Sequence, residues 1–339
     1  MSNAFEGIVA AVSARRRHWL VTGSAGFIGG HLIETLLSAG QQVTSIDDLS
    51  TGHRANLEIV RARVGEAAWS RHRFIEASIA DAAACTEACA GVDVVLHEAA
   101  LGSVPRSIET PLATHTANAT GFLTMLIAAQ TAKVSRFVYA ASSSTYGDSP
   151  TLPKVENVIG RPLSPYAVTK YLNELYADVF GRCYGVKSIG LRYFNVFGPR
   201  QDPDGAYAAV IPRWARAMVA GERCIVNGDG ETSRDFCYVE NVVQANLRAA
   251  LVEDEAALNQ VYNIAVGERT TLNQLHSEMA AALTALRPEL RVEPPRHAAF
   301  RAGDVVHSLA DISKARMLLG FEPTHDVRAG LAQAMAWYV

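Results

Sequence analysis

Strand-like and helical runs alternate from residue 18 to residue 192, and this alternation restricts the possible folds more than any other feature. Short apolar runs bounded by turn residues predict buried strands at 18–22, 42–46, 73–76, 92–97, 136–141 and 186–192. Helical patterns such as 27–38 and 112–132 lie between them. Because right-handed crossovers of this kind place successive strands parallel, we expect an α/β fold built on a doubly wound parallel sheet of the Rossmann type.

The sequence changes character after Arg192, where proline, glycine and aromatic residues replace the regular alternation. One further buried strand is predicted at 261–265, and a helical pattern starts at Leu272. An additional surface helix is expected within 1–17. The predicted dinucleotide-binding domain comprises 1–192 and 237–266, and the predicted smaller, discontinuous substrate lobe comprises 193–236 and 267–339.

The composition excludes several classes of protein. Apolar residues make up 49% of the 339 residues and charged residues 19%, with a net charge of −3, which is unlike a disordered chain or one that coats nucleic acid. No apolar run approaches the ~20 residues that cross a bilayer, so we expect no membrane partner and a cytoplasmic location. The cysteines form no C-x-x-C pair and are expected to be reduced. Cys85 and Cys89 lie one helical turn apart, but no further ligand cluster completes a site, so no metal is predicted.

A glycine-rich segment joins the first predicted strand to the first predicted helix. Gly23, Gly26 and Gly29 permit a tight turn, a close approach of the backbone to a pyrophosphate, and close packing of the helix. Phe27 and Ile28 stand at the helix start, where free N–H groups face the phosphates of a dinucleotide. The spacing is G-x-x-G-x-x-G, and an ordinary strand–turn–helix is the alternative interpretation.

Acidic residues at the end of the second predicted strand support a dinucleotide site. Asp47 stands about 20 residues beyond the turn, where a carboxylate accepts hydrogen bonds from the adenosine ribose. Asp48 adds negative charge that disfavours the 2′-phosphate of NADP. We therefore predict NAD as the cofactor, with an ordinary surface acid as the alternative for Asp47.

Further candidate cofactor contacts follow the third and fourth predicted strands. Ser78 and Ile79 follow the third strand, and Ala99 follows the fourth, at the carboxyl edge on which dinucleotides lie in such sheets. The neighbouring His97 alone is more often a core histidine. Asn118 belongs to the helix that lines this edge and is either a cofactor contact or a hydrogen-bonding brace.

A tyrosine and a lysine four residues apart carry the clearest indication of chemistry. Tyr166 and Lys170 open a predicted helix, so their side chains share one face. A fixed ammonium stabilises a phenolate, and Lys170 is therefore expected to lower the pKa of Tyr166. Ser142 follows the fifth predicted strand, where its hydroxyl can share a proton with Tyr166 and a substrate oxygen. Without the glycine turn, a Y-x-x-x-K pair is usually a solvent-facing helix.

In these motifs the chain resembles the extended short-chain dehydrogenase/reductase superfamily and, within it, the UDP-sugar 4-epimerases. The resemblance runs from Trp19 to about Tyr338 and implies a tightly held NAD. It implies that Tyr166 takes the proton of the sugar 4-hydroxyl, with Ser142 and Lys170 as its catalytic partners, while a hydride passes from C4 to the nicotinamide. The ketone then turns over in the pocket and receives the hydride on its other face.

The resemblance also implies contacts with the substrate. Asn195 resembles the residue that touches the diphosphate, and Arg234 the arginine that grips the UDP phosphates. Arg301 and Asp304 resemble the pair that holds diphosphate and ribose. A guanidinium suits this role because its planar fork meets two phosphate oxygens, although a lone arginine is otherwise a surface ion pair. The chain departs from the family at Ser78, where relatives carry an aspartate that contacts adenine, and at Glu98, which brings a charge into the turn facing the dinucleotide.

Three serines indicate which reaction within the family, and which sugar substrate, the chain favours. Ser143 and Ser144 stand where related dehydratases carry Asp and Glu, so elimination lacks its acid and base and epimerisation is favoured. Ser308 matches the family position that gates the pocket beside the sugar C2 substituent, and a serine leaves room for an N-acetyl group. Segments 101–107 and 201–211 resemble epimerases of bacterial surface-polysaccharide synthesis that prefer N-acetylated UDP-hexoses. The candidate substrate contacts in these segments are Gly102, Ser103, Ala209 and Val210.

The expected reaction is the interconversion of UDP-GlcNAc and UDP-GalNAc, with the N-acetylhexosaminuronates or UDP-glucose as alternative substrates. A non-catalytic NAD-binding sensor is the alternative from another class, since a fold alone does not fix function. A sensor needs no base, so the intact Ser142, Tyr166 and Lys170 argue against it. The resemblance further implies a homodimer that forms through the helices predicted at 112–132 and 165–184.

Overall fold

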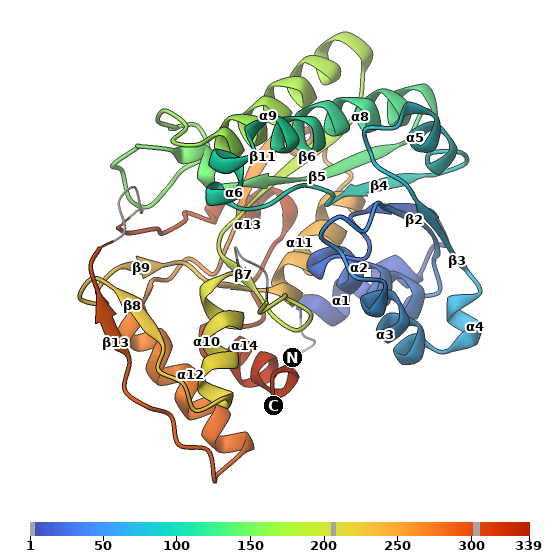
Figure 1. The fold of residues 1–339 in the computed structure, drawn as a ribbon. Coiled ribbons are helices and arrows are strands. Elements are labelled where there is room, and N and C mark those ends of the chain that lie inside the picture. The colour runs from blue at the N-terminus through green and yellow to red at the C-terminus, as the bar shows by residue number, and fades with distance from the viewer. Residues whose placement is uncertain (1–3, 205–207, 301–305) are drawn as a thin grey trace.

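The structure, a computed structural model, describes residues 4–204, 208–300 and 306–339. Its centre is a seven-stranded sheet in the order β11-β6-β5-β4-β1-β2-β3, in which all neighbouring strands are parallel (Figure 1). The strands are β1 (His18–Thr22), β2 (Gln42–Asp47), β3 (His72–Glu76), β4 (Val94–His97), β5 (Arg136–Ser142), β6 (Ser188–Tyr193) and β11 (Gln260–Ile264). The doubly wound parallel sheet predicted from the sequence is thereby confirmed.

Helices cover both faces of the sheet (Figure 1). One face packs against α5, α8 and α9 through a core that includes Phe122, Phe137 and Phe180. The other face packs against α1, α2, α3 and α11 through a core that includes Trp19 and Leu36. The bounds are α1 (Ala4–Ser13), α2 (Phe27–Ser38), α3 (Arg54–Val64), α5 (Ala82–Ala88), α8 (Gly121–Thr131), α9 (Pro165–Tyr184) and α11 (Val239–Leu251). β5 and β6 are buried along their whole length; β5 is accordingly apolar from Phe137 to Ala141 rather than alternating, whereas β6 also buries the charged Arg192.

The helix predicted at 112–132 is not regular. It begins as α7 (Pro111–His115), passes through a π-helical turn, η1 (Thr116–Thr120), and continues as α8. Gly121 marks the end of this turn, where a Cβ atom would lie 2.7 Å from Ile79 Cγ1. The extra residue in the π turn therefore lets the helix pass close to the end of β3, at the carboxyl edge of the sheet.

A smaller lobe lies below the carboxyl edge of the sheet and has its own core, which includes Trp214, Met218, Leu275 and Leu331 (Figure 1). Its helices are α10 (Val210–Val219), α12 (Leu272–Leu286) and α14 (Val327–Ala334). Its short strands are β8 (Ile225–Asn227), β9 (Ser233–Arg234), β12 (Thr270–Thr271) and β13 (Arg296–Ala298), which pair as β13-β8 and β12-β9. A further short pair, β7 (Val196–Phe197) and β10 (Cys237–Tyr238), connects this lobe to the sheet. The lobe is thus formed by segments that are far apart in the sequence.

In the described part of the chain, no helix is long and apolar enough to cross a membrane. The predicted N-terminal helix is present as α1, and its Ile8 and Val12 are buried in the core next to α11.

Candidate active site

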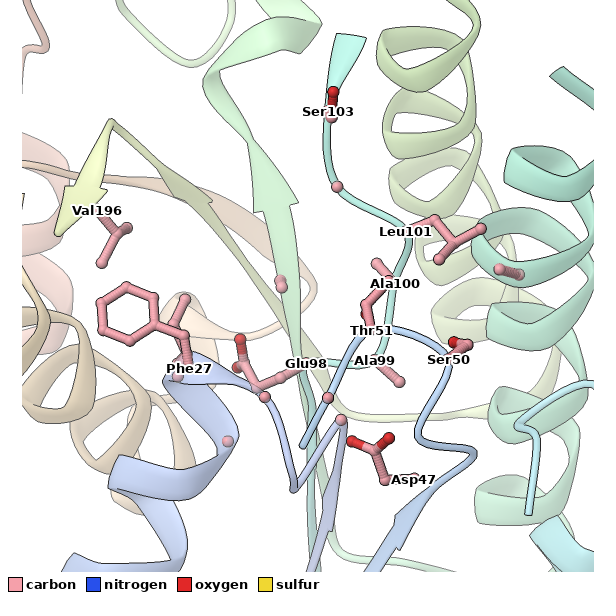
Figure 2. A pocket seen from close by; sticks show the side chains of 18 of the residues that line it. Phe27, Asp47, Ser50, Thr51, Glu98, Ala99, Ala100, Leu101, Ser103 and Val196 are labelled. Atoms are coloured by element: carbon pink, nitrogen blue, oxygen red, sulfur yellow. The ribbon is translucent and has the colours of Figure 1, made fainter. Parts of the chain in front are cut away.

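A cavity of about 600 Å³ opens at the carboxyl edge of the parallel sheet (Figure 2). It is lined by the glycine turn, by the loops that follow β2 and β4, and by the end of β5 with α9. In Figure 2, Phe27, Asp47, Glu98 and Ser103 surround it. Its position is the one at which open α/β sheets bind their ligands.

The glycine turn leaves no space for side chains. Gly23 has φ +66°, and a Cβ atom there would lie 2.8 Å from Ala99 N. A Cβ atom on Gly29 would lie 2.2 Å from Gly23 O. The turn therefore brings bare backbone to the cavity wall beside Gly26, Phe27 and Ile28, and this shape fits the diphosphate of a dinucleotide.

Asp47 is fixed by the backbone at one end of the cavity. Its Oδ2 accepts a hydrogen bond of 2.9 Å from Ala25 N, and its Oδ1 accepts one of 2.8 Å from Leu49 N. Burial raises the pKa of Asp47, while these two bonds oppose that rise. Each oxygen keeps a lone pair for a further donor, so the carboxyl group fits a ribose diol. Asp48 lies beside it in the same cavity wall.

The other predicted cofactor contacts fall into two groups. Ser78, Ile79 and Ala99 line the cavity. Asn118 does not line it: the side chain is buried in the π turn, accepts a bond of 2.7 Å from Leu101 N and donates one of 3.1 Å to Leu101 O. The structure thus places Asn118 as the brace that the sequence left as an alternative, and it holds the segment leading to Gly102 and Ser103.

Ser142, Tyr166 and Lys170 meet at the other end of the same cavity. Ser142 ends β5, and its hydroxyl lies near enough to the phenol of Tyr166 to lower the pKa of that phenol. Tyr166 stands in the first turn of α9, which begins with Pro165 and is capped by a bond of 3.1 Å from Ala167 N to Ser164 Oγ. The Lys170 ammonium donates a bond of 2.8 Å to Ala140 O.

The expected lowering of the pKa of Tyr166 by Lys170 was wrong for this structure. Burial raises the pKa of Tyr166, and the nearby Ser142 hydroxyl opposes that rise. Burial lowers the pKa of Lys170 to about 8, opposed by the charges of Glu98 and Glu174. The Lys170 ammonium is directed at Ala140 O, and no effect of its charge on the pKa of Tyr166 is resolved in the protein alone.

A buried ion pair supports this end of the cavity. Glu174 of α9 receives two bonds from Arg192 of β6, of 2.9 Å to Oε1 and 2.7 Å to Oε2. Arg192 also donates to Glu156 O at 2.9 Å and lies 4.8 Å above the ring of Tyr146, in the turn that follows Ser142. Both side chains of the pair are almost fully buried, and they connect the helix of Tyr166 to the strand next to that of Ser142.

A second cavity of about 450 Å³ lies in the smaller lobe, and Asn195 lines both cavities. Its wall includes the predicted substrate contacts Ala209, Val210 and Arg234. Arg234 donates from Nη1 to Val306 O at 3.1 Å, which ties β9 to the segment that carries Ser308.

Two predicted substrate residues, Ser144 and Ser308, lie outside the walls of both cavities. Ser144 donates to Ser142 Oγ at 2.9 Å, whereas its neighbour Ser143 does line the first cavity. Ser308 donates its backbone N–H to Ser233 O at 3.0 Å. Arg301 and Asp304 lie outside the described residues.

The structure also brings to the first cavity residues that were not predicted as contacts. Segment 50–53 follows β2, and segment 200–202 follows β7. His53 and Asp202, 149 positions apart, approach to 3.3 Å between Nε2 and Oδ2. The loop position of segment 50–53 after a strand end was a usable signal, but nothing in the sequence indicated that 200–202 would face it. Glu98, noted in the sequence only as a departure, is a cavity wall residue.

The cysteines belong to the core or to the surface rather than to this site. Cys85 and Cys89 are buried, and burial raises the pKa of both thiols to about 12. Cys85 Sγ donates to Ile79 O at 3.1 Å. Within the described ranges, no cluster of histidine, cysteine and acidic residues has a geometry that could hold a metal ion.

The sequence model of the NAD dependent epimerase/dehydratase family matches residues 19–265. The UDP-glucose 4-epimerase of Mycolicibacterium smegmatis is 34% identical over 322 residues, which are 94% of this chain and 97% of that protein. The solved UDP-N-acetylglucosamine 4-epimerase of Methanobrevibacter ruminantium, in complex with UDP-N-acetylmuramic acid, superposes with a TM-score of 0.86 at 35% identity, covering 96% and 98% of the two chains. The UDP-glucuronic acid 4-epimerase of Bacillus cereus, in complex with UDP-glucuronic acid and NAD, gives 0.83 at 28% identity, covering 95% and 98%.

Proposed function

This chain belongs to the NAD dependent epimerase/dehydratase family, and we propose that it interconverts UDP-N-acetylglucosamine and UDP-N-acetylgalactosamine by epimerisation at C4. Membership confirms the family and the cofactor predicted from the sequence. The observation that carries the proposal is that Ser142, Tyr166 and Lys170 share one cavity with the glycine turn and Asp47. Asn195 lines both that cavity and the cavity of Arg234, which supports adjoining sites for the cofactor and for the nucleotide sugar.

In the proposed reaction, Tyr166 takes the proton of the 4-hydroxyl. Ser142 lies beside the phenol and shares this proton with Tyr166 and the substrate oxygen. NAD, when bound, accepts the hydride from C4 and returns it. Because burial raises the pKa of Tyr166 in the protein alone, the base needs added positive charge beside it. Lys170, released from Ala140 O toward a bound ribose, can supply part of this charge.

The choice of reaction and sugar rests on small hydroxyl residues. Ser143 and Ser144 provide no carboxyl group for an elimination, which supports epimerisation over dehydration. The resemblance at Ser308 supports an N-acetyl substituent at C2, because relatives restricted to plain hexoses carry a large tyrosine at that position; Ser308 itself lines neither cavity. Similar proteins carry names for glucose, N-acetylglucosamine and glucuronic acid, so these sugars are the competing substrates.

Incubation of the purified protein with each UDP-sugar, followed by chromatographic separation of the epimers, tests the proposal. We expect turnover of the N-acetylhexosamines to exceed turnover of UDP-glucose and of the uronates. Turnover of the uronates alone would overturn the assigned sugar. Binding of NAD without turnover of any UDP-sugar would favour the sensor.

The base is tested by Tyr166→Phe, which is expected to retain NAD and to lose roughly 10²–10⁴-fold in kcat. Tyr171→Phe, on the same helix and outside both cavity walls, is the matched control. An active Tyr166→Phe enzyme would remove Tyr166 from its role.

We further propose a cytoplasmic homodimer. Large apolar side chains are exposed along α7, α8 and α9, where the sequence predicted the dimer contact, and they include Leu112, Ile127, Val168, Leu175 and Val179. The free cysteines support a reducing compartment. Light scattering after size exclusion tests the dimer, and a monomer at micromolar concentration would contradict it.

A further inference from the structure

Glu98 follows β4 directly, and its side chain lies in the wall of the first cavity (Figure 2). Its Oε1 accepts a hydrogen bond of 2.9 Å from the Tyr193 hydroxyl, which itself accepts one of 2.8 Å from Asn246 Nδ2. Its Oε2 is buried and has no hydrogen-bond partner among the residues that the structure describes. One half of the carboxyl group is therefore anchored, and the other half is unsatisfied.

An unsatisfied buried carboxylate is costly, so this side chain requires an account. Burial raises the pKa of Glu98 to about 7, while the bond from Tyr193 and the charge of Lys170 oppose the rise. Lys170 does not satisfy Oε2: among the described residues the hydrogen bond of its ammonium goes to Ala140 O, and Oε2 has no donor. A ligand that brings positive charge into the cavity would both stabilise the carboxylate and lower its pKa.

The titratable groups around Glu98 come from several elements. Lys170 of α9 acts on it directly, Tyr193 of β6 is bonded to it, and Tyr166 lines the same cavity. Burial raises the pKa of both tyrosines, so both are neutral near pH 7. Three further titratable groups interact with these neighbours of Glu98. His97 of β4 and Glu174 of α9 interact electrostatically with Lys170, and Cys237 of β10 interacts with Tyr193.

We infer that Glu98 is the counter-charge of an oxidised nicotinamide and biases the bound cofactor toward NAD⁺ over NADH, an inference that rests on the proposed function. The two forms differ in charge at the ring, which is positive in NAD⁺ and neutral in NADH. A buried carboxylate beside the ring would therefore stabilise the oxidised form selectively. Glu98 is bonded to Tyr193 at the end of β6, two residues before Asn195, and the charge of Lys170 acts on its carboxyl group.

This bias has a use in an epimerase. Bound NAD would accept a hydride, which is one proton with two electrons, from C4 and would return it to the ketone carbon. The return would restore the positive ring charge that Glu98 stabilises, so Glu98 would favour return of the hydride over release of the ketone. The enzyme then ends each cycle with the oxidised cofactor that the next cycle needs.

The test compares reduction of bound cofactor in the wild type and in Glu98→Gln, equilibrated against a dye couple without UDP-sugar. Gln keeps the shape and an acceptor for Tyr193 but removes the charge. We expect the cofactor in Glu98→Gln to be reduced roughly tenfold more readily, which is about 30 mV for a two-electron couple. The matched control is Asp48→Asn, which removes a carboxylate from the same cavity wall. It is expected to leave the potential unchanged, because the adenosine halves of NAD⁺ and NADH are identical.

The pH dependence separates a charge effect from a change of shape. A raised carboxyl pKa means that the charge is present above that pKa and absent below it. The difference in potential between wild type and Glu98→Gln should therefore be full at about pH 8.5 and shrink as the pH falls through the pKa of Glu98. A purely structural role would give a difference that does not vary with pH.

Should Glu98→Gln fail to fold, Tyr193→Phe tests the same idea. It removes a bond that lowers the pKa of Glu98, so the bias toward NAD⁺ should be lost at a higher pH than in the wild type. Equal potentials at all pH values, in proteins that do hold NAD, overturn this inference alone. A wild-type protein that binds no NAD overturns the proposed function as well.

Discussion

The two cavities are built in different ways. The first is bounded by the ends of parallel strands and by backbone packed so closely that Gly23 and Gly29 admit no methyl group. The second is bounded by short strand pairs, and Phe300 and Val306 in its wall are 65% and 56% exposed. The proposed cofactor site is therefore formed by the backbone, whereas the proposed sugar site is formed largely by side chains at the surface.

This difference predicts how each half responds to change. A site made of backbone cannot change shape without disturbing the sheet, so substitutions there should cost both stability and ligand binding. A site made of surface side chains can exchange them at little cost in stability, and sugar specificity can vary on a constant cofactor domain. Substitutions in the two sites test whether stability and ligand binding change together in the cofactor site and independently in the sugar site.

The largest effect on the free energy of unfolding is expected at the buried ion pair between Arg192 of β6 and Glu174 of α9. Arg192→Met leaves the carboxylate of Glu174 buried without its partner, which typically costs about 3–5 kcal/mol of the free energy of unfolding. Arg182→Met is the control, because it breaks a pair with Asp178 on the same helix whose side chains are 67% and 55% exposed. That loss should stay below about 0.5 kcal/mol. Urea denaturation measures both, and equal losses would show that burial of the pair does not matter.

A smaller loss of stability, together with loss of NAD, is expected for Gly29→Ala. The added methyl group would lie 2.2 Å from Gly23 O, and that oxygen belongs to backbone that is packed in the turn. Such overpacking costs about 1–3 kcal/mol, and the turn must open where the diphosphate is expected. Gly30→Ala, one residue along the same helix, meets its nearest neighbour at 3.8 Å and should be tolerated. Calorimetric titration with NAD compares the two variants, and normal NAD binding by Gly29→Ala would contradict a rigid turn.

The sheet and the glycine turn could be predicted because local sequence determines both. Buried strands such as β5 carry apolar runs, and Gly23 needs a positive φ that few other residues adopt. The π turn was missed because a single extra residue in a helix leaves the apolar pattern almost unchanged. It decides, however, that Asn118 faces Leu101 rather than the cavity.

Long-range contacts could not be predicted from local pattern. The approach of Asp202 to His53 depends on how the smaller lobe docks, which no spacing in the sequence encodes. The pKa of Tyr166 was misjudged for the same kind of reason: the spacing to Lys170 gave the neighbour, but burial and Glu98 are properties of the assembled site. A charged group after the buried strand β4, as at Glu98, was a signal that the site held more than its motifs, as was the position of segment 50–53 after a strand end.

The smallest effect, and the sharpest test of the comparison, is expected at Arg234. Arg234→Lys keeps the positive charge of the second cavity but loses the planar fork that suits a diphosphate, so KM for the UDP-sugar should rise roughly tenfold. NAD affinity and the free energy of unfolding should not change, because the residue lines the second cavity and not the first. Arg223→Lys in the same lobe, 64% exposed and outside both cavity walls, is the control and should behave as the wild type. If Arg234→Lys instead weakened NAD binding, the two halves would be coupled through Asn195, and the separation of a backbone-built cofactor site from a side-chain-built sugar site would fail.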